Sequence, residues 1–144
     1  MTIYNSNKYI KIKDLLKILL PAYEDPKKRI KEGIILPETN MLFRESISTL
    51  LSAILLNSIN KNPKINYEIL KYEYPNEGDG QIDEVEDLGK YKIVRDKEII
   101  EQVYINNEEE GTTTDALIRK LEGKNNDPKS DRTDEVLCIF IDKY

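Results

Sequence analysis

Histidine is absent from the 144-residue sequence, and this absence excludes more chemistry than any other feature of the composition. Without imidazole the chain cannot form Ser-His or Cys-His nucleophile pairs, use a histidine general base, or ligate zinc or iron through histidine. Carboxylate, lysine and tyrosine chemistry and oxygen-ligated ions such as Mg²⁺ or Ca²⁺ stay open. We therefore expect a protein that is not an enzyme. A carboxylate-based, divalent-metal-dependent nuclease or other hydrolase is the catalytic alternative.

Cysteine and glycine are also scarce. Cys138 is the single cysteine and lies in the apolar run VLCIFI, so no internal disulfide or zinc framework can form, and we interpret it as a small buried hydrophobic residue. Among the six glycines, neither G-x-x-x-x-G-K-[ST] nor G-x-G-x-x-G occurs. The sequence therefore predicts no phosphate-cradling loop and no cofactor.

Long hydrophobic runs are missing too. The longest apolar stretch, residues 47–59, is shorter than the roughly 20 apolar residues that cross a bilayer, and it contains Ser, Thr and Asn. The first residues, MTIYNSNKYIKIKDLL, do not form the uninterrupted apolar core of a signal peptide. These two features predict a cytoplasmic protein that does not contact the membrane.

Charge is abundant but unevenly divided along the chain. Residues 1–64 hold eleven basic and six acidic residues, a net charge of +5, whereas residues 65–144 hold eleven and twenty-one, a net charge of −10. Such an asymmetry is informative about partners rather than about fold. We expect a single domain over residues 1–144, with a basic helical half at 1–62 and an acidic, β-rich half at 63–144.

The basic half has the periodicity of helices. Apolar residues at 12, 15, 16 and 19 share one face of a helix expected over residues 8–20, which Pro21 would end. A short basic helix is expected between Pro26 and Gly33, and a long helix from Thr39 or Asn40 through Ile59.

The long helix is apolar around most of its circumference, and between residues 39 and 60 its only charged residues are Arg44 and Glu45. A helix of this kind is buried on several sides. It forms either the centre of the helical half or, on one side, an interface with another copy or a partner.

The acidic half is predicted to be mainly β-structure. Strands are expected at 65–74, with a bulge near Ile69 and Leu70, and at 90–94. Residues 97–106 fit either a helix or a strand, and a hairpin across residues 95–96 is slightly favoured. Thr112 is the expected N-cap of a helix over 112–123, and residues 124–133 are expected to form a loop. The apolar run 136–141 predicts a central strand buried on both faces.

Together these elements predict an α+β fold, in which a helical N-terminal half packs on a small, mainly antiparallel β-sheet with one additional helix. The acidic stretch at 74–87, YPNEGDGQIDEVED, partly matches a calcium-binding loop. With Gly80 at the sixth position, the candidate ligands are Glu77, Asp79 and Glu86, but Pro75 would occupy the first position without a side-chain oxygen. We interpret the stretch as a connection between strands with solvated carboxylates, and the calcium site as a weak candidate.

A basic patch is the better candidate for partner binding. It could bind phosphates or an acidic protein surface, and it comprises Lys11, Lys13, Lys17, Lys27, Lys28, Arg29 and Lys31. The leading hypothesis is a non-catalytic binding protein, an accessory subunit or inhibitor of a larger complex, including one that processes nucleic acid. Its partner is expected to be a protein or another copy of itself. The alternative is a single-stranded nucleic-acid-binding protein that uses the basic helices.

Overall fold

The computed structural model describes residues 2–24, 41–71, 74, 78–106, 108, 110–125 and 135–141. Over these ranges the chain mixes helix and strand, which confirms the predicted α+β class. The elements are, in order, β1 (Thr2–Ile3), the 3₁₀ turn η1 (Ser6–Lys8), β2 (Tyr9–Ile10), α1 (Ile12–Glu24), α3 (Met41–Ile59), β3 (Ile65–Leu70), β4 (Gly80–Asp87), β5 (Lys92–Ile105), α4 (Thr113–Asn125) and β6 (Glu135–Ile141). The first ten residues therefore contribute strands, where a helical half was expected.

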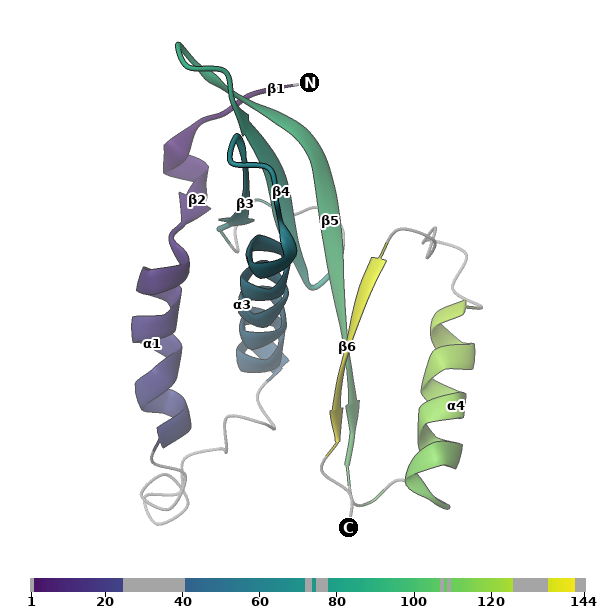
Figure 1. The fold of residues 1–144 in the computed structure, drawn as a ribbon. Coiled ribbons are helices and arrows are strands. Elements are labelled where there is room, and N and C mark those ends of the chain that lie inside the picture. The colour runs from purple at the N-terminus through teal and green to yellow at the C-terminus, as the bar shows by residue number, and fades with distance from the viewer. Residues whose placement is uncertain are drawn as a thin grey trace.

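The sheet is curled, and the N-terminal segment closes the curl (Figure 1). Among the described residues the strand order is β1-β5-β4-β3-β2, with β6 beside β5. Thr2 of β1 pairs with Val94 of β5, whereas Tyr9 of β2 pairs with Leu70 of β3. The segment from β1 to β2 thus reaches from one side of β4 to the other. All these pairings are antiparallel except that of β5 with β6, which is parallel.

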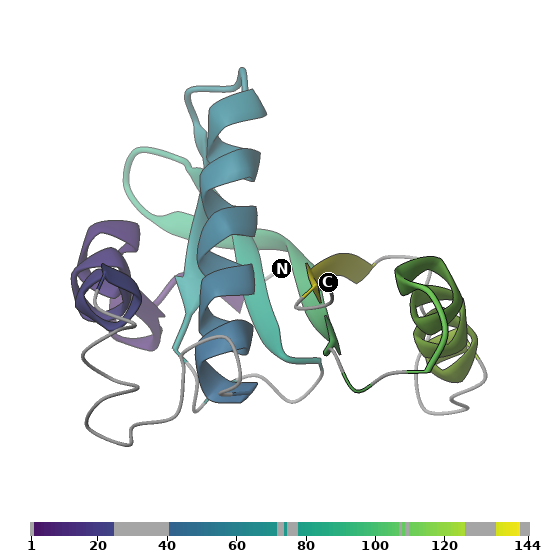
Figure 2. The ribbon, with the colours of Figure 1, turned by 90° about the horizontal axis from the view of Figure 1, so that it is seen from below.

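Helix α3 lies across one face of the sheet and contacts β3, β4 and β5, as Figure 2 shows from below. Helix α1 lies on one side of α3 and α4 on the other. The main core forms where α1, α3 and the strands meet, because their apolar side chains exclude water there. Its buried members are Leu15, Leu19, Leu50, Ala53, Ile69, Ile82 and Ile100.

The hairpin expected across residues 95–96 is wrong, because β5 runs through them as one strand from Lys92 to Ile105. A β-bulge lets β5 stay continuous while it pairs with β4 along its length. Glu84 pairs with Asp96 and Val85 with Val94, which leaves Arg95 as the extra residue. The turn lies earlier, where Gly89 has a φ of 87° and the Leu88 N–H donates to the Tyr91 carbonyl at 3.0 Å.

The acidic stretch is not a connection with solvated carboxylates, because Gly80–Asp87 forms strand β4 between β3 and β5. Ile82 and Val85 are buried, and their burial stabilises a strand despite four acidic residues. Asp83 is only 5% exposed. Strand β3 ends at Leu70, and its pairing with β4 is regular from Ile65 to Ile69, so the bulge expected near Ile69 and Leu70 is also wrong.

Strand β6 was expected at the centre of the sheet, and this prediction is wrong. Among the described strands it pairs with β5 alone, so it lies at an edge. Its odd-numbered apolar residues Leu137, Ile139 and Ile141 are 39%, 40% and 55% exposed. The even-numbered Val136 and Cys138 pack against the main core. A continuous apolar run here marks a strand that is buried on one face only.

Two helix ends differ from the prediction. Helix α1 continues through Pro21 to Glu24, because proline in the last turn of a helix removes a single intrahelical hydrogen bond. Helix α4 continues past Gly123 to Asn125. Its predicted N-cap is confirmed: the Thr112 hydroxyl accepts from the Asp115 N–H at 3.2 Å, and the Asp115 carboxylate accepts from the Thr112 N–H at 3.0 Å. No helix in the described ranges is long and apolar enough to span a membrane.

Candidate functional site

Helix α3 buries five polar side chains beside its core residues Leu50 and Ala53, which is unusual for a helix that packs on a sheet. The buried positions at a helical spacing are largely polar. Arg44, Glu45, Ser48, Thr49 and Ser52 are all at most 9% exposed. Five polar side chains on the inner face of a helix require hydrogen-bond partners, because an unsatisfied buried polar group costs about 1–3 kcal/mol.

Two of those partners come from the helix itself and the others from neighbouring strands and residue 79. The Ser48 hydroxyl donates to the Arg44 carbonyl at 2.6 Å, and the Thr49 hydroxyl donates to the Glu45 carbonyl at 2.9 Å. The Ser52 hydroxyl lies 3.6 Å from the Cys138 sulfur. Small hydroxyl side chains can be buried at little cost when they bond back to the preceding turn. Cys138 is half-buried against the core rather than fully buried.

The outer face of α3 is apolar and exposed. Leu51, Ile54, Leu55 and Ile59 are 55%, 38%, 60% and 63% exposed, and they recur at intervals of three, four and eight residues along the helix. We call these four residues the outer stripe. Figure 2 shows α1 and α4 beside α3 and, within the described part of the chain, no helix over the side of α3 that faces away from the sheet. The outer stripe contains no charge, since Arg44 and Glu45 are both on the inner side.

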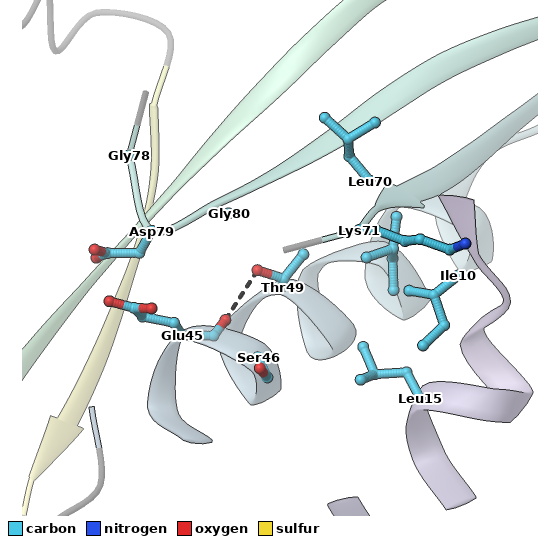
Figure 3. A pocket seen from close by; sticks show the side chains of 11 residues that line it. Ile10, Leu15, Glu45, Ser46, Thr49, Leu70, Lys71, Gly78, Asp79 and Gly80 are labelled. Atoms are coloured by element: carbon cyan, nitrogen blue, oxygen red, sulfur yellow. Dashed lines mark hydrogen bonds between the residues drawn. The ribbon is translucent and has the colours of Figure 1, made fainter. Parts of the chain in front are cut away.

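A pocket of about 490 Å³ lies where α1, α3, the end of β3 and residues 78–80 meet (Figure 3). One part of its wall is apolar, with Ile10, Leu15, Ile69 and Leu70. The polar groups are Glu45, Ser46, Thr49, Lys71 and Asp79. This volume is within the range of small-molecule sites.

Glu45 and Asp79 point toward each other in this pocket (Figure 3). Burial raises the pKa of the Glu45 carboxyl above its ordinary value of 4.5, and the charge of Asp79 and a hydrogen bond with it raise the pKa further. Asp79 is itself fixed, because its Oδ2 accepts from the Gln102 N–H at 2.7 Å. Because two negative charges this close repel each other, the Glu45 carboxyl binds a proton more readily than it would alone.

The chemistry available in this pocket is limited. A protonated carboxyl beside an ionised one can donate or accept a proton. The Thr49 hydroxyl is already engaged with the Glu45 carbonyl. Among the described residues, no group of three or more carboxylate or cysteine side chains could hold a metal ion. The pocket can therefore accept a small, partly apolar molecule, and its described lining offers a proton-sharing pair.

Two of the three calcium candidates, Asp79 and Glu86, lie at opposite ends of β4. Asp79 precedes β4 and Glu86 lies near its other end, so seven residue steps of extended chain place them roughly 20 Å apart. The Glu86 carboxylate is instead 3.4 Å from the Arg95 guanidinium. Glu77 lies outside the described residues. The extended conformation of β4 is incompatible with a loop that wraps around an ion.

The basic patch is described only in part. Lys11, Lys13 and Lys17 are exposed, and Lys13 and Lys17 are one turn apart on α1. The other four residues lie outside the described part of the chain: Lys27, Lys28, Arg29 and Lys31. Whether the two groups meet is thus not decided by the structure, and the patch stays a prediction.

Sequence reasoning missed the Glu45–Asp79 pair, whereas an apolar interface on one side of the long helix was one of its two alternatives. One signal was present: Glu45 is the single acidic residue of a long helix that is otherwise nearly free of charge. Comparison with known proteins adds no further assignment. The chain matches no protein-family model, and no curated protein or solved structure matches it significantly.

Proposed function

We propose that the protein acts by binding another protein through the outer stripe of α3, as an accessory subunit or inhibitor of a larger assembly, and not by catalysis. The observation that carries this proposal is the exposure of the apolar outer stripe of α3. Four adjacent apolar side chains are 38–63% exposed while five polar ones of the same helix are buried. Isolated exposed apolar residues are ordinary, whereas a continuous apolar stripe is typical of an interaction site.

The chemistry of the outer stripe defines its partner. Because the stripe carries no charge, a charged partner surface would lose its hydration there without gaining an ion pair. A partner that covers the stripe is therefore apolar and uncharged itself. Leu51, Leu55 and Ile59 follow the i, i+4, i+8 row of a helix, so the ridges of a second helix can fit between them. We infer that the partner presents a helix with its own leucine- or isoleucine-rich stripe.

Site-specific photo-crosslinking in the native host tests this proposal. A photoreactive phenylalanine replaces Leu55 in one variant and Tyr91 in a matched control, since both positions are similarly exposed, at 60% and 55%. We expect a discrete crosslinked product with one other protein from position 55 and none from position 91. Adding Leu51→Gln to the first variant should abolish the product. Equal products from both positions, no product, or a product formed with another copy of this chain alone would contradict the accessory role.

A further inference from the structure

The pocket between α1, α3, the end of β3 and residues 78–80 has two chemically different ends. Figure 3 places Glu45 and Asp79 at one end and Ile10, Leu15 and Leu70 at the other. Its volume of about 490 Å³ is far larger than a single water or ion needs and is within the range of small organic ligands. A ligand that contacts both ends therefore has a polar head and an apolar body.

Glu45 defines the polar head of the ligand. Asp79 already accepts from the Gln102 N–H at 2.7 Å and is hydrogen-bonded to Glu45, so it is a fixed neighbour. Burial raises the pKa of the Glu45 carboxyl most, and Asp79 and then Glu101 raise it further, whereas the Arg44 charge lowers it. The raising influences outweigh Arg44, and Glu45 therefore binds a proton readily. A ligand that brings its own positive charge can take the place of that proton.

The apolar end defines the body of the ligand. Leu15 and Ile69 are 9% and 3% exposed and belong to the main core, so this part of the wall is held in place by packing. Lys71 also lines the pocket, and Figure 3 shows its ammonium group pointing away from the Glu45–Asp79 pair. A short aliphatic chain fits such a wall, because each methylene that it removes from water strengthens binding.

We propose that this pocket binds a small aliphatic primary amine in its ammonium form. The ammonium group donates charge-assisted hydrogen bonds to the Glu45 carboxylate, and the chain lies along the apolar wall. On binding, Glu45 releases its proton to the solvent, and no covalent bond forms or breaks. The site lies on the inner side of α3, so it is independent of the proposed role of the outer stripe.

Ligand-dependent thermal stability tests the site. Wild-type protein at pH 7 is titrated with pentylammonium chloride, with 1-pentanol and with sodium pentanoate, while sodium chloride keeps the ionic strength constant. Because a ligand that binds the folded state raises the melting temperature, we expect a saturable rise with the amine and none with the alcohol or the carboxylate of the same chain length. The amine competes with the Glu45 proton, so its affinity should fall as the pH is lowered from 7 toward 4.5.

A charge variant assigns the effect to Glu45. Glu45→Gln removes the carboxylate and keeps its size, so the fold should persist. Loss of the charge-assisted contact should weaken amine binding by at least about tenfold and remove its pH dependence. Glu122→Gln removes a carboxylate from an exposed position of α4 and is the matched control, which should leave amine binding unchanged.

A second variant separates shape from charge. Ser46 lines the pocket from α3 and is only half-buried, and leucine is a good helix former. Ser46→Leu should therefore fold, fill part of the space and weaken amine binding without removing any charge. A melting temperature that the amine leaves unchanged, an equal rise with 1-pentanol, or a rise that is undiminished in Glu45→Gln or in Ser46→Leu would overturn the proposal.

Discussion

The Tyr9 hydroxyl donates a hydrogen bond to the Asp83 carboxylate at 2.6 Å, although 74 residues separate them in the chain. Asp83 is 5% exposed and accepts a second hydrogen bond from the Gln81 amide at 2.6 Å. Burial, followed by this hydrogen bond and the charge of Asp83, raises the pKa of the Tyr9 phenol. The contact ties the closing segment of the curled sheet to its central strand β4.

Replacing Tyr9 by phenylalanine should therefore destabilise the fold. Asp83 would stay buried but lose the hydrogen bond from Tyr9 and keep the one from Gln81, which costs about 1–3 kcal/mol in the free energy of unfolding. Urea denaturation measures this difference. Tyr91→Phe is the control, because Tyr91 is 55% exposed, and its effect should be within about 0.5 kcal/mol. Equal stabilities of the two variants would show that the Tyr9–Asp83 contact contributes little.

The Glu45–Asp79 pair predicts a pH dependence of stability. The pKa of Glu45 is raised in the folded state, so the folded protein binds more protons than the unfolded chain above the ordinary value of 4.5. The free energy of unfolding should accordingly fall as pH rises from 4.5 through the raised folded pKa, beyond which the full penalty applies.

Glu45→Gln removes this dependence, because the amide resembles the protonated carboxyl and can still donate to Asp79. The variant should be more stable than the wild type at pH 7 and should lose the decline above pH 4.5 in urea denaturation at a series of pH values. The exposed Glu122 supplies the control variant Glu122→Gln. A decline that is unchanged in Glu45→Gln would show that another group causes it.

Substitutions on the outer and inner sides of α3 should differ in how much they destabilise the fold. Leu55→Gln changes an outer position that is 60% exposed, so the free energy of unfolding should change by no more than about 0.5 kcal/mol. Ala53→Leu inserts a large side chain at a fully buried position, and overpacking should cost about 1–3 kcal/mol. Denaturation of both variants checks this. A larger loss in Leu55→Gln than in Ala53→Leu would mean that the outer stripe is internal core.

Two glycines provide a matched test of local packing. At Gly80, the first residue of β4, an added Cβ would collide with the Thr49 hydroxyl of α3, so Gly80→Ala should destabilise by about 1–3 kcal/mol. At Gly123, within α4, an added Cβ meets open space. Gly123→Ala should stabilise the helix by about 0.5–1 kcal/mol, since glycine is a poor helix former. Thermal melting distinguishes these opposite signs, and a shared sign would refute the close approach of α3 to β4.

Local patterns identified several elements because their causes are local. The N-cap at Thr112 depends on residues three apart in the sequence, and the long helix ending at Ile59 depends on composition and periodicity. The curl of the sheet and strand β4 were not predictable in this way. Asp83 is buried because Tyr9, far away in the chain, supplies its hydrogen bond, and no periodicity within residues 80–87 indicates that donor.

The amino-acid sequence by itself determined which residues share a side of α3, and it excluded imidazole chemistry. Only the tertiary structure decided which side meets the sheet. Serine and threonine can satisfy their hydroxyls within their own helix, so burying the polar side costs little, and the sheet selects the side with the small residues that let it approach closely. The same packing left Leu51, Leu55 and Ile59 facing outward and brought Glu45 to Asp79.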